Sequence, residues 1–222
     1  MELVLEINHK FKIISGFFNG KTNGSPLCAL FTNKKYDSSN YDKFKNFIRP
    51  GHADLTANIH YSGFNDYRDA GHLSSRLTLP LTFVGAVFEQ ILKLNHIQTF
   101  THIYSIGNIN DLSLLNRKIN YLNLKKLKNK KIAVLNENII SSIQNLIIKL
   151  NKQGDSIGGT IECGIFGIKP GIGSPIFDKI ESYIADLIFA IPAVKALEFG
   201  SGFKSSKLTG FENNDSFFIN KN

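Results

Sequence analysis

The sequence predicts an α+β fold. Stretches of strand-like alternation and stretches of helical spacing are interspersed along the 222 residues. They follow no regular strand–helix–strand rhythm, and no Gly-x-Gly-x-x-Gly motif follows a predicted strand, which argues against a doubly wound parallel sheet. The length suits one large domain or two small ones, and we expect a single domain over residues 1–222.

The first elements are predicted from alternation and from turn residues. Apolar and polar residues alternate over 3–14, which predicts a strand, and a short apolar run over 27–32 predicts a second one. The intervening residues 15–20 are predicted to form a turn. A polar loop at 37–40 and a short helix over 41–47 follow.

The same two periodicities, with proline and glycine as punctuation, predict the rest of the chain. The predicted elements are a helix over 81–94, a strand over 97–106, a polar stretch with little pattern over 107–135, a helix over 138–150, a strand over 160–168, a turn over 169–173, a helix that begins at Pro175 with Ser174 as its cap, and a strand over 194–199.

The chain is basic, with 26 lysines and arginines against 18 acidic residues and a net charge of +8. This charge favours anionic partners, a class that includes nucleic acid, phosphorylated metabolites and flavin phosphate. The densest basic run, residues 125–131, has no interleaved aromatic residue that could stack on bases. A solvated helix end or loop is therefore favoured there, and no nucleic-acid partner is expected.

The two cysteines, Cys28 and Cys163, are far apart, and no Cys-x-x-Cys spacing is present. Two buried, reduced thiols, no metal site and a cytoplasmic location are expected. No uninterrupted apolar run reaches the roughly 18 residues of a membrane span, and the first ten residues lack the features of a signal peptide, so no membrane partner is expected.

Residues 49–76 differ from the rest of the chain because they contain three of the six histidines and three arginines. The stretch also lacks the regular hydrophobic periodicity of a helix or strand. Polar residues gathered on such a loop serve a site more often than a scaffold. Arginine can bind phosphate and carboxylate in bidentate fashion, and histidine can hold a proton near neutral pH. These residues therefore suit a site for an anionic ligand.

Six runs of residues carry a more specific signal. They are Ile14–Thr22, Arg49–Asp54 (Arg-Pro-Gly-His-Ala-Asp), Asp66–Arg68 with Gly71–Ser74, Ser105–Gly107, Gly154–Gly159, and Ile191–Lys195 with Glu198–Gly200. In sequence, order and spacing these runs resemble the signatures of the chorismate synthase family. The resemblance implies antiparallel sheets and helices arranged as a β-α-β sandwich.

The resemblance also implies a chemistry. The family converts 5-enolpyruvylshikimate 3-phosphate to chorismate and phosphate by a 1,4-anti elimination in the shikimate pathway. It requires reduced FMN although the reaction has no net redox change. In some members NADPH reduces the flavin. A homotetramer is implied as well.

Site residues are implied at the matching positions. His52 stands at the catalytic position, and Arg49, Arg68 and Arg76 are candidates for the substrate. The implied FMN contacts are His72, Leu73, Ser74, Pro192 and Ala193.

Each assignment has a structural alternative. His52 could be a structural residue that closes a Pro-Gly turn, and the arginines could form ordinary salt bridges. Asp54 could orient His52 or cap a helix, and the glycines of 154–159 could form a tight turn or subunit contact rather than cradle a phosphate.

The sequence departs from the family pattern in several places. The family's Gly-Glu-Ser-His-Gly segment and its C-terminal segments have no match, so a domain truncated at both ends is expected. Within the matched part, His60 and Ser62 replace a usual lysine and glycine, and Asp69 falls in a glycine triplet. Two functions follow: the lyase itself, or an incomplete remnant that keeps the scaffold and binds a flavin, nucleotide or partner without turnover.

Overall fold

The computed structural model describes residues 11–32, 37, 39–42, 45, 47–115 and 121–215. The chain divides into two compact units, one made of residues 1–91 with 186–195 and the other of residues 92–185 with 196–222. Every strand pair in the described part is antiparallel, which confirms the α+β prediction. That the two units form a single domain stays a prediction.

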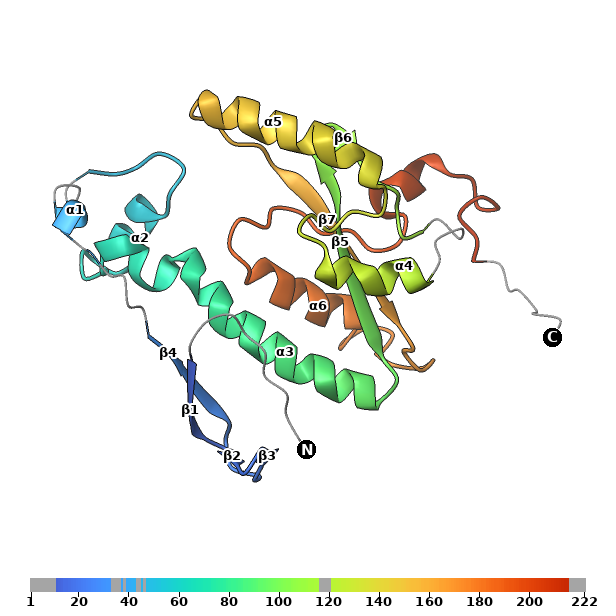
Figure 1. Cartoon of the computed structure of the whole chain (residues 1–222), viewed down its shortest axis with the longest axis horizontal. Helices are drawn as coiled ribbons and strands as arrows, with labels where there is room; N and C mark the ends of the chain where they lie inside the picture. The colour runs from blue at the N-terminus through green and yellow to red at the C-terminus, as the bar shows by residue number, and fades with distance from the viewer. Residues whose placement is uncertain are drawn as a thin grey trace. The chain divides into compact units, whose positions relative to one another are not determined.

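Figure 1 shows the elements along the chain. They are β1 (Phe11–Ser15), β2 (Phe17–Phe18), β3 (Lys21–Thr22), β4 (Cys28–Phe31), α1 (Ser39–Asp42), α2 (Asp54–His60), the 3-10 turns η1 (Arg68–Leu73) and η2 (Ser75–Leu77), α3 (Thr78–Leu94), β5 (Gln98–Ile106), β6 (Ile109–Asn110), α4 (Tyr121–Lys126), η3 (Leu127–Asn129), η4 (Glu137–Ile139), α5 (Ile140–Lys152), β7 (Gly159–Phe166), α6 (Ile180–Phe189) and η5 (Gly202–Lys207).

Three phenylalanines join β1, β4 and α3 in the first unit. Phe11 of β1 lies opposite Phe31 of β4, and both rings pack edge-on against Phe83 of α3, with ring centroids 5.3 and 5.7 Å away. Phe83 is only 5% exposed. The strand predicted over 27–32 is confirmed. Of the strand predicted over 3–14, residues 3–10 lie outside the described part.

The turn predicted over 15–20 is shorter in the structure, because residues 17–18 and 21–22 pair as β2 and β3 around Asn19-Gly20. The helix expected over 41–47 overlaps α1 only at residues 41–42, and the described residues 45 and 47 are not helical. Residues 43, 44 and 46 lie outside the described part. The helix expected from residue 81 begins at Thr78. Its lead-in turn is capped by Ser74, whose hydroxyl accepts from the Arg76 N–H.

The helical run Ser75–Leu94 has a mean hydropathy of 1.4 and is the one described helix long and apolar enough to cross a membrane. Helices of soluble proteins meet the same criterion. Phe83 of this helix packs on Phe11 and Phe31. Other apolar residues of the helix, including Leu81, Val84 and Phe88, are exposed.

The second unit is built on a sheet of order β6-β5-β7. One face of β5 carries Phe100, which packs with Leu124 of α4 and Leu127 of η3 into a buried cluster. The Phe166 ring of β7 lies edge-on to Phe100, with centroids 5.5 Å apart. The strands predicted over 97–106 and 160–168 and the helix over 138–150 are confirmed.

A buried polar network lies on the same face as Phe100. The His102 ring is 1% exposed and places Nδ1 3.1 Å from Asp111 and Nε2 2.9 Å from Glu162. Asp111 also accepts from the backbone N–H groups of Leu135 and Asn136. Glu162 accepts from the Ser113 hydroxyl and the Leu114 N–H. The network therefore ties two loops to two strands.

Three predictions of local structure were wrong. The last helix begins at Ile180 rather than Pro175, because Asp178 adopts a positive φ of 57° that no helix accepts, and its carboxylate receives the Tyr183 hydroxyl at 2.6 Å. Residues 194–199 form no strand, because no described strand pairs with them. The stretch 107–135, expected to lack pattern, contains β6, α4 and η3.

Candidate functional site

The run Arg49–Asp54 forms a turn that leads into α2. Pro50 and Gly51 occupy the two central positions, and the His52 N–H donates to the Arg49 carbonyl at 3.3 Å. Gly51 has a φ of 75°, which a type II turn requires at this position and which favours glycine. The backbone of His52 closes the turn, while its imidazole is exposed and makes no hydrogen bond to any described residue. His52 can therefore close the turn with its backbone and still offer its imidazole to a ligand.

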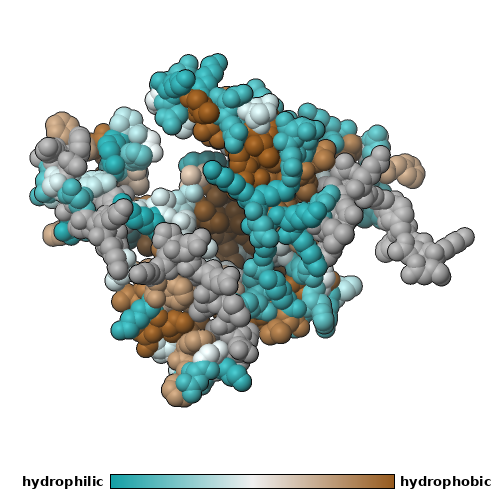
Figure 2. Space-filling view, viewed as in Figure 1, coloured by the Kyte–Doolittle hydropathy of each residue, from teal (hydrophilic) through white to brown (hydrophobic). Residues whose placement is uncertain are grey.

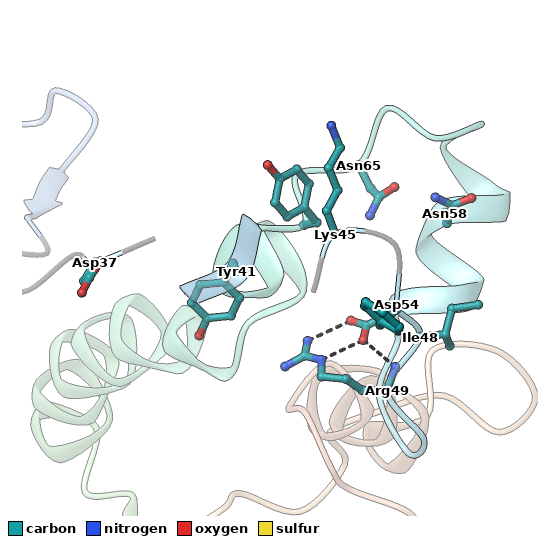
Figure 3. Close-up of a pocket in the computed structure, with 10 residues that line it drawn as sticks. Asp37, Tyr41, Lys45, Ile48, Arg49, Asp54, Asn58 and Asn65 are labelled. Carbon is teal, nitrogen blue, oxygen red and sulfur yellow. Dashed lines mark hydrogen bonds and ion pairs between the residues drawn. The ribbon is translucent and has the colours of Figure 1, made fainter. Parts of the chain in front are cut away.

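Arg49 and Asp54 face each other across this turn. Arg49 donates from Nε and Nη2 to the two carboxylate oxygens at 2.8 Å each, and its backbone N–H donates at 3.1 Å (Figure 3). The Arg49 guanidinium holds the pKa of Asp54 at about 2, well below its usual range. Asp54 is the first residue of α2 but makes no side-chain cap, and it does not bond His52. Its observed role is to fix Arg49.

A pocket of about 700 Å³ opens beside this ion pair, a volume in the range of small-molecule sites. Figure 3 shows Asn58 on α2, one helical turn after Asp54, and Asn65 on the following loop. The pocket is also lined by Asp37, Tyr41, Lys45, Phe47, Ile48 and Tyr67. Lys45 and Arg49 balance two aspartates, so the lining offers directed donors rather than a net positive field.

Tyr67 fixes the rim of this pocket. Its hydroxyl donates to Asp42 at the end of α1 at 2.7 Å, and this hydrogen bond raises the pKa of Tyr67. Lys45 lies over the Tyr67 ring, 5.5 Å from its centroid. Tyr41, Asn58, Asn65 and Tyr67 were not among the site residues predicted from the sequence. The spacing of Asn58 four residues after Asp54, on one helix face, is the signal that could have found it.

Asp54→Asn should destabilise the protein by about 1 kcal/mol at neutral pH, after allowance for solvent screening of a partly exposed pair. The folded pKa of about 2 lies below the usual value, so the stabilisation is present above about pH 4 and is lost as pH falls toward 2. Urea unfolding at pH 6 and pH 2.5 should show the two proteins converging in acid. An equal gap at both pH values would contradict this role of the pair.

The second predicted cluster lies on η1. The Nε2 atom of His72 is 3.0 Å from the Tyr61 hydroxyl, and Tyr61 is the C-cap of α2. Gly71 has a φ of 49°, and a Cβ there would lie 2.9 Å from the Asp66 carbonyl oxygen. Glycine is therefore required beside His72. His52 and the His72–Tyr61 pair lie beyond opposite ends of α2, a helix about 10 Å long.

The remaining candidates differ in their surroundings. Arg68 donates from Nε and Nη2 to Asp66 at 2.9 Å each and lowers the pKa of that carboxyl. Arg76 and Leu73 are exposed, and Leu73 exposes 41% of its surface. Neither Arg68 nor Arg76 lines the described pocket.

Pro192 and Ala193 belong to the same compact unit as His52 and His72. Ala193 has a φ of 69°, a left-handed conformation that costs about 1–2 kcal/mol for a residue with a Cβ. Strain of this kind gathers at ligand-binding positions. The outlier therefore coincides with a position that the family resemblance assigns to the cofactor.

The departures from the family pattern have local structural consequences. Ser62, where the family carries glycine, takes a φ of 51°, so the change places a Cβ in a conformation that glycine adopts freely. The ring of His60 stacks edge-on to Tyr61 at 4.7 Å. The side chain of Asp69 lies outside the described part.

The fold and this loop define an α+β protein with a histidine- and arginine-bearing turn beside a pocket. The family model for chorismate synthase matches residues 6–222. The chain is 38% identical over 213 residues to a chorismate synthase of Korarchaeum cryptofilum and 39% identical over 213 residues to one of Methanosphaera stadtmanae. The chain belongs to the chorismate synthase family.

A solved structure titled as a crystal structure of chorismate synthase matches with a TM-score of 0.76 at 26% identity and covers 93% of this chain. The fold is therefore chorismate synthase-like, as the sequence predicted. These alignments cover 93% and 96% of this chain but only 56% and 57% of the two relatives. The chain thus spans little more than half the length of the curated relatives it matches.

Proposed function

We propose that this chain carries the turn and the cofactor loop of a chorismate synthase-type lyase. In the proposed reaction, 5-enolpyruvylshikimate 3-phosphate loses phosphate and a ring proton by 1,4-anti elimination. A C–O bond and a C–H bond break, a C=C bond forms, and chorismate and phosphate are released. Family membership supports the reaction class, and the exposed imidazole of His52 is the observation that supports a working site.

His52 is suited to the leaving phosphate. The backbone N–H of His52 closes the Pro-Gly turn, which fixes the position of its Cα. The ring itself makes no hydrogen bond to a described residue and is available to a ligand. A protonated imidazole can donate its proton to a phosphate oxygen as the C–O bond breaks. Arg49, already oriented by Asp54, retains donors that can bind a substrate oxyanion, because two of the five guanidinium N–H groups suffice for the pair. Arg68 and Arg76 are the further substrate candidates.

The loop residues fit a flavin nucleotide in kind. His72 and Ser74 offer polar groups, Leu73 offers an exposed apolar surface for a ring, and Ala193 holds a strained backbone at the second contact position. Reduced FMN, when bound, would supply electron density to the elimination and return unchanged. We propose His72, Leu73, Ser74, Pro192 and Ala193 as its contacts, with NADPH as a possible source of reducing equivalents.

His72→Asp should weaken binding of reduced FMN at least tenfold. A carboxylate would repel the flavin phosphate, and it would replace the ring that contacts the Tyr61 hydroxyl. Anaerobic titration with reduced FMN measures the affinity. His96→Asp, which adds the same charge after α3 outside the proposed site, serves as the control. Equal affinities for the two variants would remove His72 from the cofactor contacts.

An anaerobic assay with reduced FMN and 5-enolpyruvylshikimate 3-phosphate, followed by chorismate absorbance, tests the function. It is best run on this chain alone and again with the part of the Methanosphaera stadtmanae relative that has no counterpart here. FMN-dependent turnover in either sample supports the lyase. Absence of turnover in both, with folding verified by circular dichroism, would overturn it.

The partial coverage of the relatives favours a second candidate, a binding scaffold without turnover. Flavin binding without elimination in the same assay would identify it. A cytoplasmic location and a homotetramer are proposed with the lyase by analogy to the family.

A further inference from the structure

Strand β7 presents an open apolar face. Its residues alternate between the two sides of the sheet, and the side with Glu162 faces the buried His102 network. On the other side, Ile161 is 69% exposed, Ile165 is 41% exposed, and Cys163 between them is exposed. The expectation that both thiols are buried was therefore wrong, since Cys28 is exposed as well. Two isoleucines and a thiol in a row are the pattern of a strand that is covered on both faces.

The outer edge of β7 is open as well. The sheet order is β6-β5-β7, so β7 has a strand partner on one side only among the described residues. Proteins protect such edges with charge, proline or bulges. β7 has no proline, and its one charged side chain, Glu162, is held on the opposite face by His102, Ser113 and Leu114. The edge is therefore suited to pair with another strand.

Part of the solved chorismate synthase has no counterpart in this chain. The match covers 93% of this chain but only 59% of the solved chorismate synthase. About two fifths of that solved chain therefore has no counterpart here. The matched part shares its fold with that structure at a TM-score of 0.76. Figure 2 shows further apolar surface on the β1–β4 hairpin and along α5, where Ile14, Leu30 and Ile148 are exposed.

We propose that the open face and outer edge of β7 bind the part of the chorismate synthase fold that has no counterpart in this chain, whether that part is joined to it or is a separate polypeptide. Ile161, Cys163 and Ile165 lie at the centre of this surface, which we term the β7 face. The proposal concerns assembly, and binding can be measured whether or not the assembly turns over substrate.

Cys163 reports directly on the β7 face. The chain has two cysteines, so Cys28→Ser leaves Cys163 as the single thiol. The rate of its alkylation is measured with and without the unmatched part of the Methanosphaera stadtmanae relative, which is 39% identical over the shared part. We expect rapid alkylation of the chain alone and at least a tenfold slower rate in the presence of that polypeptide. A fusion of the two provides the same comparison if the separate polypeptide does not fold.

Matched charge variants locate the contact. Ile161→Lys should weaken binding of the added polypeptide at least 100-fold, whereas Asn145→Lys, at an exposed polar position of α5, should leave it within twofold. Three results would overturn the proposal. These are slow alkylation in the isolated monomer, which would mean that the chain covers the face itself; protection that grows with chain concentration alone, which would identify a second copy; and unchanged alkylation in the complex or fusion.

Discussion

His52→Ala should lower kcat/KM for chorismate formation by about 100- to 10,000-fold, the range that a positioned general acid contributes. The substitution leaves the turn intact, because the backbone N–H of residue 52 closes it on the Arg49 carbonyl. Removal of the ring therefore takes away a proton donor without removing a structural contact. The measurement is the anaerobic assay with reduced FMN, made on whichever sample turns over.

His96→Asn is the control for this prediction. His96 adopts a positive φ of 61°, which asparagine tolerates, and it lies between α3 and β5 outside the proposed site. Its activity should match that of the unmodified protein. Activity of His52→Ala within threefold of the control would exclude His52 as the acid and leave it as a turn residue only.

His102→Leu should destabilise the protein by about 3–5 kcal/mol, because it leaves two carboxylates beside an apolar side chain in a buried place. The Asp111 side chain is fully buried, and the Glu162 side chain is 22% exposed. Urea unfolding followed by circular dichroism measures the change. His102→Gln, which can still donate one hydrogen bond, should lose less stability than His102→Leu.

Thr101→Val provides the matched control on the neighbouring position of β5. Thr101 is exposed on the other face of the sheet, where its hydroxyl lies 3.4 Å from the Cys163 sulfur. Its replacement should change stability by no more than about 0.5 kcal/mol. A loss below about 1 kcal/mol for His102→Leu would show that the network is not a major source of stability.

These two histidines show where sequence reasoning succeeded and where it did not. His52 was predicted from a run of six residues whose Pro-Gly pair encodes its own turn, so local chemistry was sufficient. Nothing in the sequence around His102 distinguishes it from an ordinary strand residue. Its partners lie 9 and 60 residues away, and no local pattern indicates that Asp111 and Glu162 converge on one ring.

The errors in secondary structure have the same origin. The periodicity after Pro175 is helical, but Asp178 takes a left-handed conformation that delays the helix to Ile180. Residues 194–199 have the composition of a strand, yet a strand requires a neighbouring backbone, and composition does not supply one. Leu124 and Leu127 lie in a lysine-rich stretch whose pattern does not mark them as core residues. Their burial depends on contact with Phe100.

The sequence by itself determined the α+β class, the strands and long helices with clear periodicity, and the resemblance to chorismate synthases, because each is written in local order and spacing. Only the tertiary structure decided that Asp54 fixes Arg49, that Asn58 and Tyr67 line the pocket, that His102 is buried between two acids, and that the β7 face is open. Those features depend on which distant segments meet, and that outcome is set by packing and backbone pairing across the whole chain rather than by neighbouring residues.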